Sequence, residues 1–254
     1  MRARFGARKF IAYFQAFTNT YAPLEVLRHL YDSAVDFPDV VGLSVGTRPD
    51  CVPEPVLDLL EEYRHRGYVQ VELGLESVRD DSLRWMNRCH SVEEFRDAVR
   101  RTRNRGLEIC THLIFGLPRE GHREEVQAAD EINSLEVEGV KIHMLHVLRH
   151  SPLEKTYAAG RLSLLDRESY VALVVDHLEH LRPDVVIHRL TGEAPPHRLI
   201  APHWCLDKNR VLEGIREEIR RRKTWQGKLY RLRGTPETLV TKTGRPRPCA
   251  GFSG

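Results

Sequence analysis

The stretch Val69-Gln70-Val71-Glu72-Leu73-Gly74-Leu75-Glu76-Ser77 decides the fold class of the chain. Up to position 76, apolar residues at odd positions alternate with polar residues or glycine at even positions, which is the period of a strand with two different faces. The apolar face can pack on helices. Because burying an unpaired polar group costs about 1–3 kcal/mol, and a carboxylate more, we expect the polar face to line a hydrated, ligand-holding lumen.

Strands and helices alternate on both sides of this stretch. The predicted strands are 9–16, 40–46, 69–76, 107–115, 140–147 and 185–190. The predicted helices run from Pro23 to about Ala34, from Pro53 onward, from a cap at Asp80 or Asp81, from a capping box of Ser91 and Glu94 to Gly106, and over 122–137, 166–181 and 207–223. Parallel crossovers are right-handed and curl a sheet consistently, so this α/β pattern predicts a partial (β/α) TIM-like barrel.

The length of 254 residues suits one globular domain. We expect this domain to cover residues 1–230, followed by a basic, disordered tail over 231–254 that is rich in Gly, Pro and Thr. The net charge of the chain is +3, but residues 208–247 hold thirteen Lys and Arg against four Asp and Glu. This basic segment could bind phosphate or an RNA such as a tRNA-like partner, although a solvated helix is the commoner meaning of a charge run.

Membrane insertion and disulfide bonding are not expected. No apolar stretch approaches the roughly 18 residues that span a bilayer, and Met1-Arg2-Ala3-Arg4 lacks the apolar core of a signal peptide. We therefore expect a cytoplasmic protein. Its five cysteines are separated by 38, 21, 95 and 44 positions, which fits neither a disulfide framework nor a metal knuckle. They are Cys51, Cys89, Cys110, Cys205 and Cys249.

The second predicted strand ends in Gly46-Thr47-Arg48-Pro49-Asp50, a rigid turn at the C-terminal mouth, where barrel enzymes hold their active sites. Arg48 offers a planar fork for a carboxylate or phosphate, and Asp50 can accept a hydrogen bond from a hydroxyl. Alternatively, the two residues stabilise a turn and cap the helix at Pro53. Spacing alone favours neither interpretation.

Two acidic residues, Glu72 and Glu76, share one face of the third predicted strand. Such paired carboxylates can exchange protons or hold ribose hydroxyls, and Gly74 between them would admit a ligand close to the backbone. The alternative is an ion-pair layer with Lys141 or Arg48. We favour that layer for Glu72, and a site role for Glu76, which is nearer the mouth.

Several enzyme classes are disfavoured by spacing or by missing motifs. Inward histidines at strand ends can gather around zinc, but His143 and His146 are three positions apart and would point to opposite faces of one strand. No His-x-His pair occurs on the first predicted strand, so we predict no metal ligands. A glycine-rich phosphate loop, a nucleophile elbow and a dinucleotide fingerprint are missing as well.

Six motifs follow one another along the chain: Ala12-Tyr13-Phe14-Gln15-Ala16-Phe17-Thr18, Val41-Gly42-Leu43-Ser44-Val45-Gly46-Thr47-Arg48-Pro49-Asp50, Glu72-Leu73-Gly74-Leu75-Glu76-Ser77, His112-Leu113-Ile114-Phe115-Gly116-Leu117-Pro118, Lys141-Ile142-His143 and Ala201-Pro202-His203-Trp204-Cys205. In this order they resemble the YhcC-type radical SAM proteins, relatives of the Elp3 and oxygen-independent coproporphyrinogen oxidase group. The resemblance runs from about residue 8 to Tyr230.

This resemblance implies a radical SAM barrel that binds a [4Fe–4S] cluster and S-adenosylmethionine (SAM). With an electron donor, SAM is cleaved to a 5′-deoxyadenosyl radical that abstracts hydrogen from a substrate, here unknown. The cofactor-binding positions implied are Gln15, within Tyr13-Phe14-Gln15, at the SAM amino group, Ser44, Arg48 and Asp50 beside its amino-acid and ribose parts, Glu76 and Ser77 near the ribose, and Ile114 and Gly116 near the adenine. The substrate-side positions implied are His112, Lys141, His143 and His188.

The sequence departs from the family in two respects. No three cysteines are close enough in sequence to hold a cluster in the family's way, and Arg119 replaces the glycine expected before Glu120. One explanation is a chain that starts late and lacks the first βα unit with its ligands. The other is a cluster-free relative that binds a nucleoside-like ligand or RNA. We favour the first, because Met1 lies in an Arg-rich stretch and a missing strand would expose an edge at 10–14.

Overall fold

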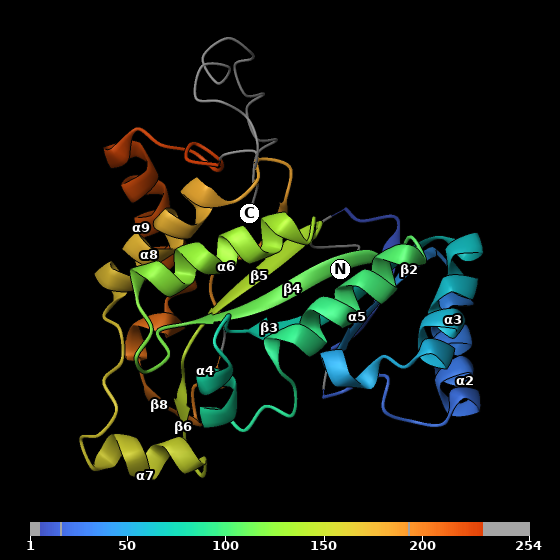
Figure 1. Ribbon diagram of the computed structural model, residues 1–254, viewed down its shortest axis with the longest axis horizontal. Helices are drawn as coiled ribbons and strands as arrows, with labels where there is room; N and C mark the ends of the chain where they lie inside the picture. Colours follow the sequence, from blue (N-terminus) through green and yellow to red (C-terminus); the bar gives the residue numbers. More distant parts are fainter. Residues whose placement is uncertain (1–5, 16, 193, 231–254) are drawn as a thin grey trace.

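The computed structural model describes residues 6–15, 17–192 and 194–230. Six strands form one parallel sheet in the order β1-β2-β3-β4-β5-β7 (Figure 1). Their bounds are β1 Phe10–Phe14, β2 Val40–Thr47, β3 Tyr68–Glu76, β4 Glu108–Phe115, β5 Gly139–Met144 and β7 Val186–Arg189. Side chains from β1 and β5 meet across the concave face. The sheet is therefore a curled half-barrel, which confirms the predicted α/β partial barrel.

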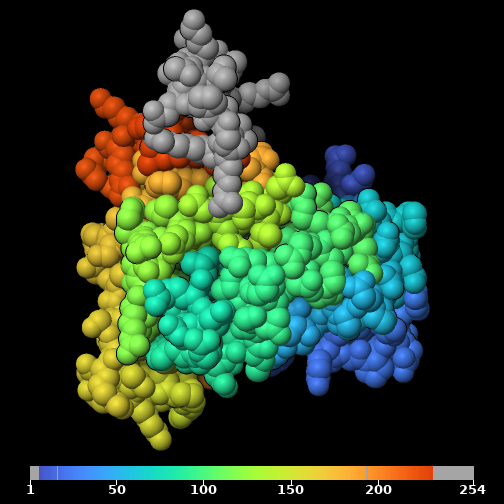
Figure 2. Space-filling view, viewed as in Figure 1, coloured from blue at the N-terminus to red at the C-terminus, as the bar shows by residue number. Residues whose placement is uncertain are grey.

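Apart from α7, the helices lie where the sequence predicted them. They are α2 Leu24–Val35, α3 Glu54–Glu62, α4 Asp80–Trp85, α5 Val92–Asn104, α6 His122–Ser134, α7 Pro152–Ala158, α8 Arg167–His180 and α9 Lys208–Arg222, with short 3-10 turns η1 Pro49–Cys51, η2 Tyr63–Arg66 and η3 His203–Leu206. Figure 1 shows α5 and α6 over one face of the sheet. In the space-filling view these helices cover most of the visible face (Figure 2).

Helix packing buries the apolar face of the sheet. The odd positions of β3 are at most 4% exposed, and so are the predicted stripe residues of the helix after Pro53; these side chains are Val69, Val71, Leu73 and Leu75, and Val56, Leu59, Leu60 and Tyr63. The predicted capping box is also confirmed, because Glu94 N donates to Ser91 Oγ at 3.2 Å and Ser91 N donates to Glu94 Oε2 at 2.7 Å. Because the odd positions of β3 pack against the helices, its even positions lie on the concave face.

Strand register stacks the polar residues of the concave face in levels. Glu72 is paired with Cys110 of β4, and His112 of β4 is paired with Lys141 of β5. A bulge between Gly74 and Glu76 shifts the β3–β4 register near the mouth. Bulges bend a strand locally and redirect its side chains, so the end of β3 does not continue the alternation of its middle.

Two predictions about elements were wrong, and one helix was missed. The segment 140–147 is not one strand, because β5 ends at Met144 and β6 Val147–Leu148 pairs antiparallel with β8 Leu199–Ala201 in a second sheet. Periodicity did not locate this break, because no turn residue such as Gly or Pro separates the two strands. Asp80 does not cap α4; it accepts from Val92 N at 2.8 Å and ties α4 to α5. Helix α7 was not predicted at all.

The expected tail over 231–254 lies outside the described residues, so the proposed domain division stays a prediction. Within the described ranges, no helix is long and apolar enough to cross a membrane.

Candidate functional site

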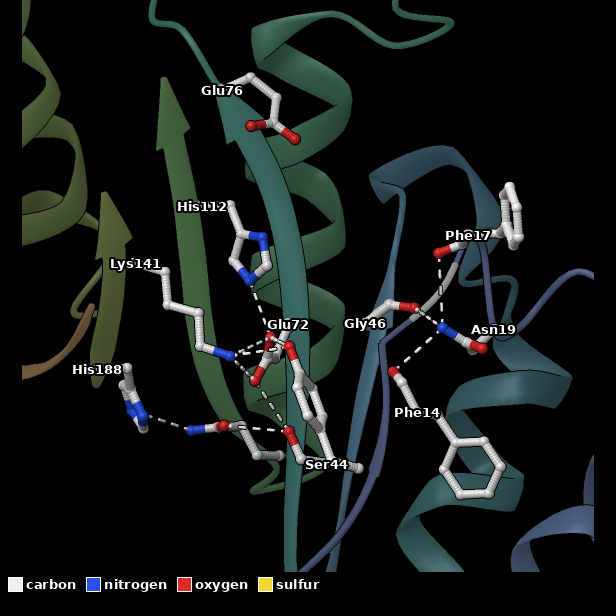
Figure 3. A network of polar contacts seen from close by, with 12 residues as sticks. Phe14, Phe17, Asn19, Ser44, Gly46, Glu72, Glu76, His112, Lys141 and His188 are labelled. Carbon is white, nitrogen blue, oxygen red and sulfur yellow. Dashed lines mark hydrogen bonds and ion pairs between the residues drawn. The ribbon is translucent and has the colours of Figure 1, made fainter. Parts of the chain in front are cut away.

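Glu72, in the middle of β3, is the centre of a polar network on the concave face (Figure 3). Lys141 Nζ donates to both of its carboxylate oxygens, at 2.6 and 2.7 Å. Tyr13 Oη donates to Oε2 at 2.7 Å, Ser44 Oγ donates to Oε1 at 3.0 Å, and His112 Nε2 lies 2.8 Å from Oε2. The five strands β1 to β5 each contribute one of these side chains. The ion-pair layer with Lys141 is therefore confirmed.

The network fixes the charge of Glu72. Its side chain is only 2% exposed, and burial disfavours the charged form, but hydrogen bonds from His112, Lys141 and Tyr13 outweigh burial and lower the pKa of Glu72 to about 2. Burial and the neighbouring carboxylate raise the pKa of Tyr13. Glu72 is thus ionised at neutral pH, with both oxygens engaged. Because its oxygens are already hydrogen-bonded, Glu72 forms the base of the lumen and does not act as a proton acceptor.

A second set of contacts surrounds the Glu72 network. Ser44 Oγ also donates to Gln70 Oε1 at 3.3 Å, and Gln70 Nε2 lies 3.5 Å from His188 Nε2. The rings of His112 and His143 are 5.7 Å apart between centroids. The four residues predicted for the substrate side therefore gather on one face, on β4, β5 and β7. The resemblance implied Tyr13, with Gln15, at the SAM amino group, and its place in the Glu72 network was not predicted, although the first strand's alternation put it on the same face as Gln15.

His143 and His146 are not separated as strand alternation predicts. A Cβ atom placed on Gly192 would lie 3.0 Å from His143 Nδ1 and 3.1 Å from His146 Cε1, so both imidazoles approach one glycine. The alternation rule does not apply because β5 ends at Met144, between the two histidines. Burial, followed by repulsion from His112, lowers the pKa of His143 to about 3, so its ring is neutral.

At the mouth, Arg48 and Asp50 bind each other. Arg48 Nε donates to Asp50 Oδ1 at 2.9 Å, and a second bond joins Nη2 and Oδ2. Burial works to raise the pKa of Asp50, but the guanidinium outweighs it and the pKa is lowered. Neither side chain caps the helix at Pro53, which has no side-chain cap. The two side chains therefore stabilise the turn but do not cap the helix, and their predicted role beside SAM stays a prediction.

The space above Gly74 is filled by protein. A Cβ atom on Gly74 would collide with Glu76 Oε1 and lie 2.7 Å from Arg88 Nη2. Glu76 has a φ of 64°, and its carboxylate pairs with Arg88 at 3.0 Å. The glycine thus makes room for the folded-back Glu76 side chain, whereas the sequence predicted room for a ligand. Burial raises the pKa of Glu76.

Ser77 and Glu120 join the ends of β3 and β4 through a short hydrogen bond from Ser77 Oγ to Glu120 Oε1. In the turn after β4, Arg119 has a φ of 68°. This left-handed conformation favours glycine, which the sequence comparison with the family led us to expect at this position. The turn therefore has a conformation that suits the expected glycine, although the residue is arginine.

The remaining implied SAM-binding residues lie near the same edge. Gln15 is exposed just past the end of β1, and Asn19 holds that end to β2 by donating to Phe14 O and Gly46 O at 3.1 and 2.9 Å (Figure 3). Ile114 is half-buried. Gly116 is covered, since a Cβ there would lie 2.8 Å from Leu165 Cδ1.

Metal-binding groups are scarce among the described residues. One group of three ligand atoms lies within 4.8 Å, from Glu72, Cys110 and His112. Lys141 already holds both oxygens of Glu72, and burial raises the pKa of Cys110, so its thiol stays protonated. In the described part of the chain, no three cysteines come together. These residues therefore do not fit a [4Fe–4S] cluster, which is held by cysteine thiolates.

The basic segment is partly neutralised where it is described. Arg220 pairs with Glu213, Arg221 with Glu218, and Arg222 with Glu218 and Asp176. The solvated-helix interpretation fits the last turns of α9, because these three arginines pair with acids of their own helix or of α8. Residues 231–247 of the segment lie outside the described residues.

The curled parallel sheet, with a polar concave face and charged residues at its carboxyl edge, defines a partial barrel. Comparison with known proteins gives the family. The chain belongs to the radical SAM superfamily, as a YhcC-type protein: the Radical SAM superfamily matches residues 1–132, and the Radical_SAM C-terminal domain matches residues 137–221.

Two curated relatives are close. The chain is 43% identical over 222 residues to the uncharacterized protein YtqA of Bacillus subtilis. This match covers 87% of this chain and 69% of YtqA. It is 43% identical over 200 residues to protein YhcC of Escherichia coli, which covers 78% of this chain and 65% of YhcC. The chain thus spans about two thirds of the length of both relatives.

A solved structure shares the fold. The archaeal Methanocaldococcus infernus Elp3 with an N-terminal deletion has a TM-score of 0.75 at 18% sequence identity. The likeness covers 89% of this chain and 57% of the Elp3 chain, and at that identity it concerns the fold alone.

Proposed function

We propose that this chain provides the SAM-binding and substrate-binding part of a radical SAM enzyme. The observation that carries the proposal is the convergence of polar groups at the carboxyl edge of β2, β3 and β4, in a chain of the radical SAM superfamily. In partial and complete (β/α) barrels this edge is where ligands bind.

The mouth residues are suited to the parts of SAM. The guanidinium of Arg48 can share its fork between Asp50 and the amino-acid carboxylate of SAM. Ser77 and Glu120 offer a hydroxyl and a carboxylate for ribose hydroxyls. Ile114 supplies an apolar surface for the adenine. Each of these roles is a proposal about this chain's own residues.

We assign the reductive cleavage of SAM to groups other than the described residues. In the family, a [4Fe–4S] cluster and an electron donor supply that chemistry. The described cysteines do not fit a cluster, so we assign to the described residues the binding of SAM and of a substrate, and no step of the cleavage.

The substrate would meet neutral hydrogen-bonding groups. Glu72 and Lys141 cancel each other's charge beneath the lumen, and burial lowers the pKa of both His143 and His188. A buried neutral imidazole can donate or accept one hydrogen bond. We therefore expect the lumen to select an uncharged part of the substrate.

Isothermal titration calorimetry with SAM tests the proposal. Arg48→Ala should weaken SAM binding about tenfold, because it removes a charge-assisted hydrogen bond. The matched control is Arg64→Ala at the opposite end of the strands, where Arg64 donates to Arg105 O; its affinity should equal that of the wild type. Unchanged affinity in Arg48→Ala would sink the assignment. Equal affinity for SAM and adenosine would favour the cluster-free nucleoside-binding alternative.

A further inference from the structure

The last strand of the main sheet carries a bulge that turns an arginine toward the lumen. In the pairing of β5 with β7, Val140 is paired with Ile187. The next residue of β5, Lys141, is paired with Arg189, so His188 is an extra residue between the two pairs. Paired residues of neighbouring strands point to the same face of a sheet, and Arg189 therefore lies on the concave face with Lys141. Bulges redirect side chains in this way at sheet edges and next to active sites.

The charge of Arg189 acts on polar groups of two other strands. Burial and repulsion from His112, followed by repulsion from Arg189, lower the pKa of His143 on β5 to about 3. Burial and a neighbouring carboxylate raise the pKa of Tyr13 on β1, and the charge of Arg189 opposes that rise. Strands β1 and β5 face each other across the concave side, where Tyr13 contacts Lys141. The guanidinium of Arg189 therefore faces the lumen that these strands line.

Arg189 differs from the other arginines of comparable burial in having no counter-charge. It is half-buried, and its guanidinium has no hydrogen bond or ion pair with any described residue. Every other half-buried arginine in the described ranges pairs with a carboxylate within 3.4 Å, as Arg88 does with Glu76 and Arg182 with Asp184. Withdrawing a charge from water without a partner costs free energy. The unpaired guanidinium therefore points to an anion that binds beside it.

Neighbouring groups neither duplicate nor cancel the charge of Arg189. Lys141 Nζ is engaged by both oxygens of Glu72 and by the hydroxyl of Tyr13 at 2.9 Å. His143 is neutral, because its pKa is about 3. Figure 3 shows His188 on the same side of Glu72 as Lys141, and burial lowers the pKa of His188 as well. Among the described residues of the lumen, Arg189 thus carries the uncompensated positive charge.

One free guanidinium matches one kind of anion. Its planar fork binds a carboxylate through two parallel hydrogen bonds and cancels the single charge of that group. A phosphate monoester carries nearly two negative charges at pH 7, so part of its charge would stay without a counter-charge among neutral rings. The charge at this place therefore suits a carboxylate better than a phosphate.

We propose that Arg189 binds a carboxylate group of the substrate, while the uncharged part of the substrate lies over the middle of the lumen. This inference rests on the proposed function, because it takes the lumen as the place where the substrate binds. It adds the substrate class, a carboxylate-bearing molecule, and the residue that selects it. The contact needs neither SAM nor a cluster, so small probes can test it on the full chain.

Benzoate, benzamide and phenyl phosphate are matched probes, since they share a ring and differ in the polar group. Ligand-observed NMR titration gives the affinity of each probe. The wild type should bind benzoate about tenfold more tightly than benzamide, because benzamide lacks the charge for a charge-assisted hydrogen bond. With isotope-labelled arginine, benzoate should also shift the Nε–H signal of Arg189. Arg189→Gln should bind both probes equally, whereas Arg189→Lys should keep part of the preference, because it keeps the charge without the fork.

The control is Arg216→Gln on α9, where Arg216 pairs with Glu213 at 3.5 Å. It should keep the wild-type preference for benzoate. Arg189→Gln should melt at or above the wild-type temperature, because it removes an unpaired charge. A preference for benzoate that survives Arg189→Gln would overturn the proposal. So would a melting temperature lowered by more than about 5 °C in that variant, since the guanidinium would then stabilise the fold. Tighter binding of phenyl phosphate than of benzoate would overturn the carboxylate as the ligand.

SAM titration separates this inference from the proposed function. Arg189→Gln should bind SAM like the wild type, and a tenfold loss of SAM affinity would overturn the inference by placing Arg189 in the SAM site. Arg48→Ala should keep the preference for benzoate. If Arg48→Ala binds SAM with full affinity while benzoate still depends on Arg189, the proposed SAM site fails and the carboxylate site stands.

Discussion

Replacing Lys141 by methionine should destabilise the protein strongly and reverse the effect of mild acid on its stability. Methionine keeps most of the side-chain volume but leaves the carboxylate of Glu72, which is 2% exposed, without its cation. The pKa of Glu72 is about 2, compared with 4.5 in the unfolded chain, a difference worth about 3 kcal/mol. Breaking a buried ion pair costs about 3–5 kcal/mol. We therefore expect the melting temperature to fall by about 10 °C.

The pH dependence supplies the sharper readout. In the wild type the folded-state pKa is depressed, so the stabilisation from Glu72 is present above pH 4.5 and is lost as the pH falls toward 2. Without Lys141, the pKa of Glu72 should rise above its unfolded value. The variant should then become more stable between pH 7 and pH 5, because protonation removes the buried charge.

Urea unfolding at pH 7 and pH 5 measures both effects. Lys155→Met on the exposed side of α7 is the control and should change the free energy of unfolding by less than about 0.5 kcal/mol. The double variant Lys141→Met with Glu72→Gln should recover much of the loss, since it removes the uncompensated charge. The reasoning is refuted if Lys141→Met costs less than about 1 kcal/mol and shows no gain at pH 5.

Two further predictions concern other buried acids. Burial raises the pKa of Glu125 to about 7, so its contribution to stability is largest below pH 4.5 and declines by about 3 kcal/mol as the pH rises through 7. In urea unfolding from pH 5 to pH 8, Glu125→Gln should flatten this decline. An unchanged pH profile of the free energy of unfolding would contradict the prediction. Gly74→Ala should cost about 1–3 kcal/mol, because the new methyl displaces Glu76 from Arg88; a variant with wild-type thermal stability would show that the carboxylate moves freely.

Sequence patterns predicted the strands and helices well where one face is apolar. The alternation in β3 and the capping box at Ser91 both depend on neighbouring residues, so the sequence carries them directly. The break after Met144 depends on where the chain leaves the sheet, and no Gly or Pro marks that point in the sequence.

The site was predicted in part for a similar reason. Strand faces correctly brought Lys141 and His112 toward Glu72, because register in a parallel sheet follows from the fold. Partner choice at the mouth could not be predicted, since it depends on rotamers and on the bulge near Glu76.

The contact between Tyr13 and Lys141 has a mechanical consequence. Their polar atoms are 2.9 Å apart although three strands separate β1 from β5 in the sheet. The pair thus crosses the concave side of the sheet, and both side chains also bind the carboxylate of Glu72. Flattening of the sheet must break this contact first, so β1 and β5 should open to hydrogen exchange together and not one by one. The width of the lumen is therefore set by three side chains, and small changes in their length should widen or narrow it.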